Sequence, residues 1–221
     1  DRDLGRAVAL DNGDVARLQQ YASLQRRSPG HALVETLRSL EVALGDVPES
    51  IGVLREAAEV ELATGGDRAS VLELLSALKD RSAEHWKRGD ESARPHATWA
   101  MRTQVDLYAA GGEHPEAVAV LIKAAEDLPF SVAESRALRA AAAERSARDL
   151  GDTAGAITLY EALYGEAPND AHIIARLADL YDAAAMRVEL LSLRRHELSL
   201  TDDASRRMQL RMDIARNQRA L

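Results

Sequence analysis

The apolar positions of this chain recur at helical spacing, in runs separated by short turns. The stretch from 137 to 183 shows the pattern most fully. Gly151-Asp152 divides it, because glycine suits the left-handed end of one helix and aspartate can cap the start of the next. Pro168 ends the second run. The apolar residues that share one stripe of that run are Ala156, Ile157, Tyr160 and Leu163. This stretch therefore predicts three helices joined by two tight turns.

Similar punctuation predicts helices along the rest of the chain. We expect them at 1–10, 15–27 and 31–44, from Pro48 to the Gly65-Gly66-Asp67 turn, from there to about residue 79, and at 203–221 behind a Thr201-Asp202 cap. Residues 80–97 are the most polar stretch, which predicts a helix end and a longer loop. Gly155 lies inside a predicted helix, where it costs about 1 kcal/mol relative to alanine. No run of alternating Val, Ile or Thr indicates a strand, so the sequence predicts an all-α protein.

The spacing of these features resembles the tetratricopeptide repeat (TPR), a helical hairpin of about 34 residues. With Ala137 as the first position of a unit, Gly151-Asp152 falls on the turn of the family and Pro168 on its closing proline. The small and aromatic positions of the family are matched by Ala156 and Tyr160 in this unit and by Ala178 and Tyr181 in the next. This resemblance implies a right-handed α-solenoid of about six TPR-like hairpins.

The resemblance divides the chain into three parts. Residues 98–221 hold the best units, at 98–131, 137–170 and 171–204. Residues 1–79 resemble degenerate TPR-like hairpins, and 80–97 would interrupt an otherwise continuous solenoid. About five extra residues precede Ala137, which predicts an irregular pitch there. The chain starts without Met and ends inside a helical pattern, as expected of a fragment of a larger bacterial protein with an irregular TPR array.

Composition excludes several classes of protein. The formal net charge is −8 and is spread evenly along the chain, which disfavours a nucleic-acid binder because such proteins usually carry a basic face. The longest apolar run, 117–122, is far shorter than the roughly 20 residues that span a bilayer, so no direct membrane insertion is expected. With no Cys there is no disulfide and no thiolate metal site. The compartment stays open between cytoplasm, slightly favoured, and periplasm.

No catalytic pattern stands out. His196-Glu197 begins the motif of a zinc hydrolase helix, but Leu200 occupies the place of the second histidine ligand. The six histidines share no ligand spacing, and neither a Gly-rich phosphate loop nor a G-x-S-x-G motif occurs. We therefore expect a protein that is not an enzyme and that carries no cofactor or metal.

In TPR proteins the first helix of each unit lines a concave groove, and the resemblance carries this property to defined residues. The partner-binding candidates are Trp99, Arg102, Asp106, Arg145, Arg148, His172, Arg176 and Asp179, with Thr103, Leu138, Ala141, Ala142, Ala175 and Asp182 beside them. Arginine suits carboxylates and tryptophan offers a flat apolar anchor, so a peptide with acidic and apolar groups is expected. The alternative is that the arginines pair with Asp179, Asp182 and other neighbours as solvated structure.

The resemblance also limits the kind of partner. TPRs that clamp a C-terminal carboxylate use Lys and Asn, whereas the corresponding pairs here are Arg102/Asp106, Ala141/Arg145 and Ala175/Asp179, so a clamp of that type is not expected. The resemblance implies a non-catalytic scaffold that binds a partner protein or peptide in its groove. Two alternatives remain: a peptide-sensing regulatory domain that controls an effector domain outside this fragment, and self-association.

Overall fold

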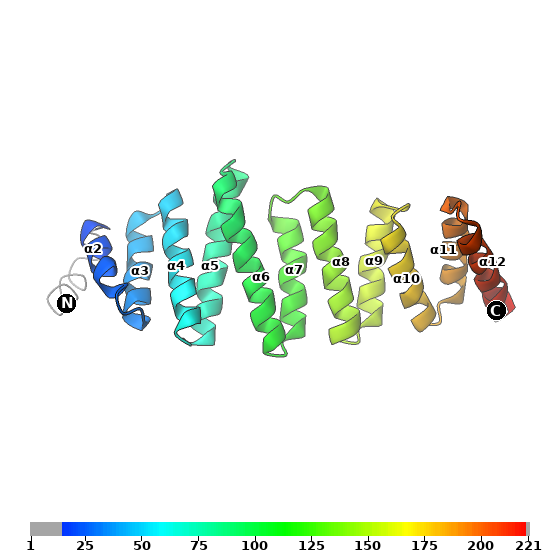
Figure 1. The fold of residues 1–221 in the computed structure, drawn as a ribbon, viewed down its shortest axis with the longest axis horizontal. Coiled ribbons are helices and arrows are strands. Elements are labelled where there is room, and N and C mark those ends of the chain that lie inside the picture. Colours follow the sequence, from blue (N-terminus) through cyan, green and yellow to red (C-terminus); the bar gives the residue numbers. More distant parts are fainter. Residues whose placement is uncertain (1–14, 220–221) are drawn as a thin grey trace. The chain divides into compact units, whose positions relative to one another are not determined.

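The computed structural model describes residues 15–219, and these residues are all helix and turn, with no strand. The helices are α2 (Val15–Gln25), α3 (His31–Leu44), α4 (Pro48–Ala63), α5 (Arg68–Lys87), α6 (Arg94–Ala110), α7 (His114–Asp127), α8 (Val132–Asp149), α9 (Thr153–Glu166), α10 (Ala171–Ala183), α11 (Arg187–Leu200) and α12 (Ala204–Arg219), and a 3₁₀ turn, η1 (Glu91–Ala93), precedes α6 (Figure 1). The helix expected at 1–10 lies outside the described residues.

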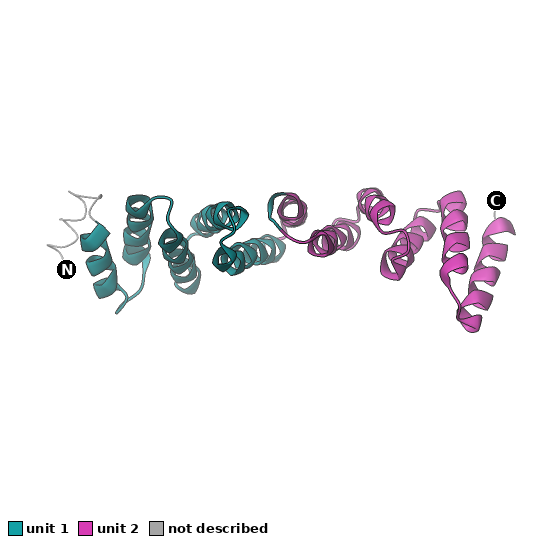
Figure 2. Cartoon of the chain, turned by 90° about the horizontal axis from the view of Figure 1, so that it is seen from above, with its two compact units in different colours: residues 1–111, 127–129 teal, residues 112–126, 130–221 magenta. Residues whose placement is uncertain are grey.

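The chain forms two compact units, coloured separately in Figure 2. Unit 1 holds residues 1–111 and 127–129, and unit 2 holds 112–126 and 130–221. Within unit 1 each helix from α2 to α6 packs against the next, and within unit 2 the same holds from α8 to α12. The connecting turns are short, so consecutive helices run antiparallel. This stacking of hairpins confirms the prediction of an all-α protein built of helical hairpins.

The turns between helices share one backbone device. Gly45, Gly65, Gly89, Gly112 and Gly151 all have positive φ, between 65° and 95°, which glycine adopts without steric cost. In three turns the residue after the left-handed one donates its backbone N–H to a helix carbonyl five residues earlier. These bonds run from Gly66 N to Glu61 O (2.9 Å), Asp90 N to His85 O (3.1 Å) and Met186 N to Tyr181 O (2.9 Å). The last of these turns has no glycine, and Ala185 takes the left-handed conformation with φ 56°.

The loop predicted at 80–97 is mostly helix, which corrects that expectation. Helix α5 continues to Lys87 and α6 begins at Arg94, so only residues 88–93 lie between them. This polar stretch contains a buried helical stripe. Its members, Ser82, Ala83, His85 and Trp86, face inward, while their charged neighbours face solvent. The stripe contains few aliphatic residues, and the sequence pattern therefore did not reveal it.

Two helix starts also differ from expectation. Helix α8 begins at Val132, so the extra residues before Ala137 form its first turns. Ser131 caps it in a reciprocal box: the Ser131 side chain accepts from Glu134 N (3.3 Å), and the Glu134 side chain accepts from Ser131 N (3.0 Å). Helix α12 is capped by Asp203, which accepts from Arg206 N at 2.6 Å, and not by the predicted Thr201-Asp202 pair.

Small residues bring the helices of unit 2 close together. Ala142, Ala143, Ala156 and Ala178 are fully buried where α8, α9 and α10 meet. Larger side chains fill the remaining core, namely Ile157, Tyr160, Leu163, Ile173, Ile174, Leu177, Tyr181, Leu190 and Leu193. Close approach of the backbones leaves the polar ends of the longer side chains at the surface of α8 and α10. These ends form the site described next.

Candidate functional site

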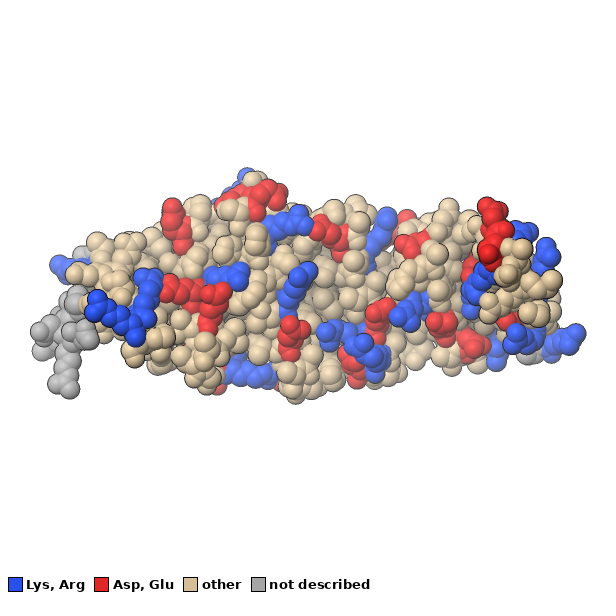
Figure 3. All heavy atoms as spheres, viewed as in Figure 1, with Lys and Arg blue, Asp and Glu red and all other residues tan. Residues whose placement is uncertain are grey.

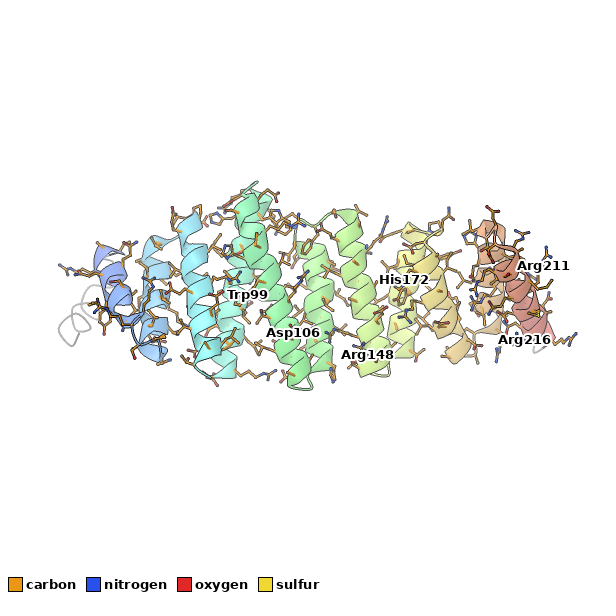
Figure 4. The ribbon with its side chains drawn as sticks, viewed as in Figure 1. Trp99, Asp106, Arg148, His172, Arg211 and Arg216 are labelled. Atoms are coloured by element: carbon orange, nitrogen blue, oxygen red, sulfur yellow. The ribbon has the colours of Figure 1, made fainter. Side chains whose placement is uncertain are left out.

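A cleft of about 280 Å³ opens in unit 2 between α8, α9 and α10. Its lining residues are Glu144, Ala147 and Arg148 from α8, Tyr160 from α9, and Arg176, Asp179 and Leu180 from α10. Arg148, Arg176 and Asp179 are among the residues predicted from the sequence. Figure 4 shows Arg148 near the C-terminal end of α8. The cleft therefore brings together side chains from three helices, with apolar and charged groups side by side.

Glu144 is the centre of the polar network in this cleft. Its Oε1 lies 3.5 Å from the Tyr160 hydroxyl, which donates to it, and 3.3 Å from Arg176 Nε. His172 Nε2 lies 3.7 Å from the same oxygen. Groups from α9 and α10 thus converge on one carboxylate of α8. This convergence fixes the carboxylate and leaves the outer faces of Arg176 and His172 toward solvent, where both residues are exposed.

Tyr160 forms the floor of the cleft. Its side chain is 1 % exposed, and burial raises the pKa of the phenol to about 12, with a further rise from the Glu144 charge and an opposing effect of Arg176. The hydroxyl is therefore protonated at neutral pH and acts as a hydrogen-bond donor. A buried donor that already has a carboxylate acceptor stiffens the cleft.

Arg145 and Arg148, the two α8 arginines predicted from the sequence, pair with Asp149 of their own helix. Arg148 donates to Asp149 through Nε (2.7 Å) and Nη2 (3.2 Å), and Arg145 Nη1 lies 3.6 Å from Asp149. The hydrogen bond from Arg148 lowers the pKa of the Asp149 carboxyl below its usual value. The arginines of the cleft therefore do pair within the chain, with Asp149 and Glu144 and not with Asp179 or Asp182. The Arg148 side chain is still 69 % exposed.

Asp179 lines a second cleft of about 320 Å³ between α10, α11 and α12. The other residues around it are Asp182, Arg187, Leu190, Arg194, Asp213, Arg216 and Asn217. Its arginines are paired: Arg187 with Asp182 at 3.0 Å, Arg194 with Glu197 at 2.7 Å, and Arg216, labelled in Figure 4, with Asp213 at 2.9 Å. Charge is thus largely balanced within this cleft. Asp179 makes no ion pair within the described part of the chain.

The remaining partner-binding candidates, Trp99, Arg102 and Asp106, lie on α6 in unit 1. Trp99 and Arg102 line a shallow pocket of about 390 Å³ together with Arg94, Pro95 and Thr98. Asp106 does not line it, because Trp99 lies in the N-terminal half of α6 and Asp106 in its C-terminal half. The Arg55 guanidinium of α4 stacks on the Trp99 ring, 4.1 Å from its centroid. Thr103, also named from the sequence, donates its hydroxyl to the Trp99 carbonyl at 2.8 Å.

Sequence reasoning missed the residues that give the first cleft its shape. Glu144 lies one helical turn before Arg148, so helix spacing could have indicated it. The stripe pattern assigned Tyr160 to the core, which is right for its ring and says nothing of its hydroxyl. Ala142, named as a groove residue, is fully buried between helices. Its small size at a helix contact explains the difference.

The described residues contain no group of three or more His, Asp or Glu placed to hold a metal ion. None of the helices in the described range is long and apolar enough to cross a membrane. On the face seen in Figure 3, acidic and basic side chains are interspersed. The clefts of the described residues have walls that combine hydrogen-bonding and apolar groups.

Comparison with known proteins gives similarity only at the level of solved structures. No family model and no curated protein matches the chain. Two crystal structures of nearly identical TPR-like repeats from Podosopora anserina, described as belonging to a kinesin light chain, are similar to it. One is 18% identical, covers 90% of this chain and 93% of its own, and has a TM-score of 0.39. The other, a variant with a single substitution, is 19% identical over 99% and 96%, with a TM-score of 0.38. Similarity this weak carries no argument, and the fold is defined by the helices and turns of the chain itself.

Proposed function

We propose that this protein is a non-catalytic scaffold that binds a partner protein or peptide in the cleft formed by α8, α9 and α10. The observation that carries the proposal is the composition of this cleft above Tyr160. Its walls combine Ala147 and Leu180 with the charged ends of Arg148, Arg176 and Asp179. A concave site with apolar walls and a few placed polar groups is the usual form of a recognition site.

The cleft offers a partner both pre-organisation and unused bonding capacity. Its residues stand on packed helices, and Tyr160 is buried at its floor. Binding therefore requires little ordering of the protein, so contact energy is retained as affinity. Asp179 has no ion pair in the described chain, and Arg148 exposes most of its side chain, so both can bond to a partner without first losing a buried partner.

A peptide-display selection on the purified chain tests the proposal. We expect to select peptides that bind with micromolar affinity, as measured by fluorescence anisotropy. The Arg148→Glu/Arg176→Glu variant should bind them roughly tenfold or more weakly, because two cationic donors are replaced by carboxylates that repel the acidic groups of a peptide. Lys123→Glu is the matched control: Lys123 is exposed on α7 and makes no ion pair in the described chain. Circular dichroism verifies that helicity is retained. Equal affinity of the cleft variant and the control, or no selected peptide above background, would overturn the proposal.

A further inference from the structure

We infer that the α6 pocket in unit 1 is a binding site of its own for a peptide in which an acidic side chain lies next to an apolar one. This inference rests on the proposed function and names the peptide chemistry that this pocket recognises. The pocket is lined by Arg94, Pro95, Thr98, Trp99 and Arg102, and none of these carries a negative charge. Both clefts of unit 2, in contrast, contain acids and bases together.

Arg102 is the cation available to a ligand. Its side chain is exposed, and it makes no ion pair with any described residue, whereas the arginines of the unit 2 clefts are paired with Asp149, Glu144, Asp182, Glu197 and Asp213. A carboxylate can therefore approach Arg102 without displacing an internal acid. Arginine binds carboxylates through two parallel N–H donors, which gives direction as well as strength.

Trp99 supplies the apolar half of the site and is held in position. Thr103 bonds to its carbonyl, and Arg55 stacks on its ring, itself held by a 2.8 Å hydrogen bond from Nε to Glu59. Trp99 and Arg102 are three residues apart on α6, so their side chains are neighbours on one helix face. A carboxylate on Arg102 thus places the adjacent side chain of the ligand over Trp99 and Pro95.

Charge complementarity selects the occupant. Burial is the main cause of a lowered pKa of the His96 imidazole. The nearby Arg55 charge lowers this pKa further, while Glu59 and Asp90 oppose the shift. Arg55 is paired with Glu59 at 2.8 Å, so the cations that line the pocket itself are Arg94 and Arg102. A lysine-bearing peptide would meet Arg102 and Arg94 at short range and be repelled. A peptide with Glu or Asp beside Leu or an aromatic residue fits both halves of the pocket.

Titrations with three matched synthetic peptides test the inference. The peptides carry Glu-Leu-Glu, Gln-Leu-Gln or Lys-Leu-Lys between Gly-Ser flanks. The chain has two tryptophans, so a ¹⁵N-labelled sample gives two indole N–H signals, assigned with Trp99→Phe. We expect the Trp99 signal to shift with Glu-Leu-Glu and the signal of buried Trp86 to stay. The apparent affinity should fall by roughly tenfold for Gln-Leu-Gln and for the Arg102→Glu variant with Glu-Leu-Glu.

The controls separate this inference from the proposed function. Arg27→Glu, at an exposed arginine of the α2–α3 turn that makes no ion pair in the described chain, should bind Glu-Leu-Glu as the unaltered protein does. Arg102→Lys should bind with intermediate affinity. Equal shifts with Gln-Leu-Gln, or unchanged binding by Arg102→Glu, would overturn the inference. If either of these results is obtained while peptides from the display selection still lose affinity in the Arg148→Glu/Arg176→Glu variant, this inference fails and the scaffold proposal stands.

Discussion

Ala185 holds a backbone conformation that five other turns give to glycine. Its φ of 56° lies in the left-handed region, where the Cβ atom costs about 1–2 kcal/mol. The turn is nevertheless closed by the same five-residue bond, from Met186 N to Tyr181 O, as the turns at Gly65 and Gly89. Tertiary packing of α10 and α11 therefore imposes the turn on a residue that disfavours it. Sequence reasoning found no glycine here and had no means to place the left-handed residue.

Replacing Ala185 with glycine should stabilise the protein. The expected gain in the free energy of unfolding is about 1 kcal/mol, reduced somewhat because glycine also adds entropy to the unfolded chain. Urea denaturation measures it. Ala162→Gly, at an exposed position inside α9, is the matched control and should lose about 1 kcal/mol. Destabilisation by both changes to the same extent would show that Ala185 is not strained.

Gly155 shows how a cap can reverse a propensity argument. The sequence alone indicates a helix interior where alanine would be better. In the structure Gly155 N donates to Asp152 Oδ1 at 2.9 Å, and a Cβ at Gly155 would lie 2.1 Å from Asp152 Oδ2. The glycine thus leaves room for the capping carboxylate of α9. Glycine costs about 1 kcal/mol relative to alanine in a helix, and the Asp152 cap that it permits stabilises the helix by about the same amount.

A double-mutant cycle separates these two effects. Gly155→Ala should bring little or no gain in stability in the unaltered protein, because the new methyl displaces the Asp152 carboxylate. In an Asp152→Ala background, which itself costs about 1 kcal/mol, the same change should stabilise by up to about 1 kcal/mol. Thermal or urea unfolding gives all four values. A gain of equal size in both backgrounds would mean that the cap and the methyl do not compete.

Between elements, the pairing of α8 with α9 is reinforced by one carboxylate and two arginines. Arg139 Nη1 and Nη2 lie 2.5 Å and 2.9 Å from the two oxygens of Glu166, and Arg136 Nε lies 3.2 Å from one of them. The Arg139 bond is the largest cause of a lowered Glu166 pKa, about 2, with Arg136 adding to it and burial opposing. All three side chains are partly exposed, so solvent screens the interaction.

This network predicts a defined pH dependence. Because the Glu166 pKa is lower in the folded state than its usual 4.5, the stabilisation is complete above about pH 4.5 and is lost as the pH falls toward 2. Glu166→Gln should therefore lower the stability at neutral pH by less than about 1 kcal/mol, given the exposure of the group. The difference from the unaltered protein should vanish near pH 2 and shrink in high salt. A difference that persists under that acidic condition would point to packing and not charge.

At this scale the sequence predicted what local chemistry determines. Helix α3 ends at Gly45 and α4 begins at Pro48, as the sequence predicts, since a turn glycine and a proline in the first helical turn act within a few residues. The Ser131–Glu134 box was also visible in the sequence, but anchoring the repeat at Ala137 obscured it. The Glu144–Tyr160 contact could not be predicted, because it depends on how α8 and α9 are rotated against each other. That rotation is set by the buried alanines between them.

For the molecule as a whole, net charge limits how an acidic partner can bind. The chain carries −8, and acidic and basic side chains are mixed over the face in Figure 3. At moderate salt the Debye length is about 10 Å, so an acidic group beyond the immediate reach of Arg102 meets a surface that on average repels it. Attraction at the α6 pocket is therefore local, unlike the extended basic face of a nucleic-acid binder.

Because attraction is confined to the surroundings of Arg102, only a few acidic residues of a peptide should strengthen its binding. A peptide in which Glu-Leu-Glu is flanked by further glutamates should bind no more tightly than the version flanked by Gly-Ser, and less tightly at low ionic strength, where repulsion by the net charge extends furthest. Raising the salt concentration should bring the two affinities together. Anisotropy titrations at several salt concentrations measure both. A polyacidic peptide that binds much more tightly, with an affinity that falls steeply with salt, would require an extended cationic surface, which a protein of this charge balance does not predict.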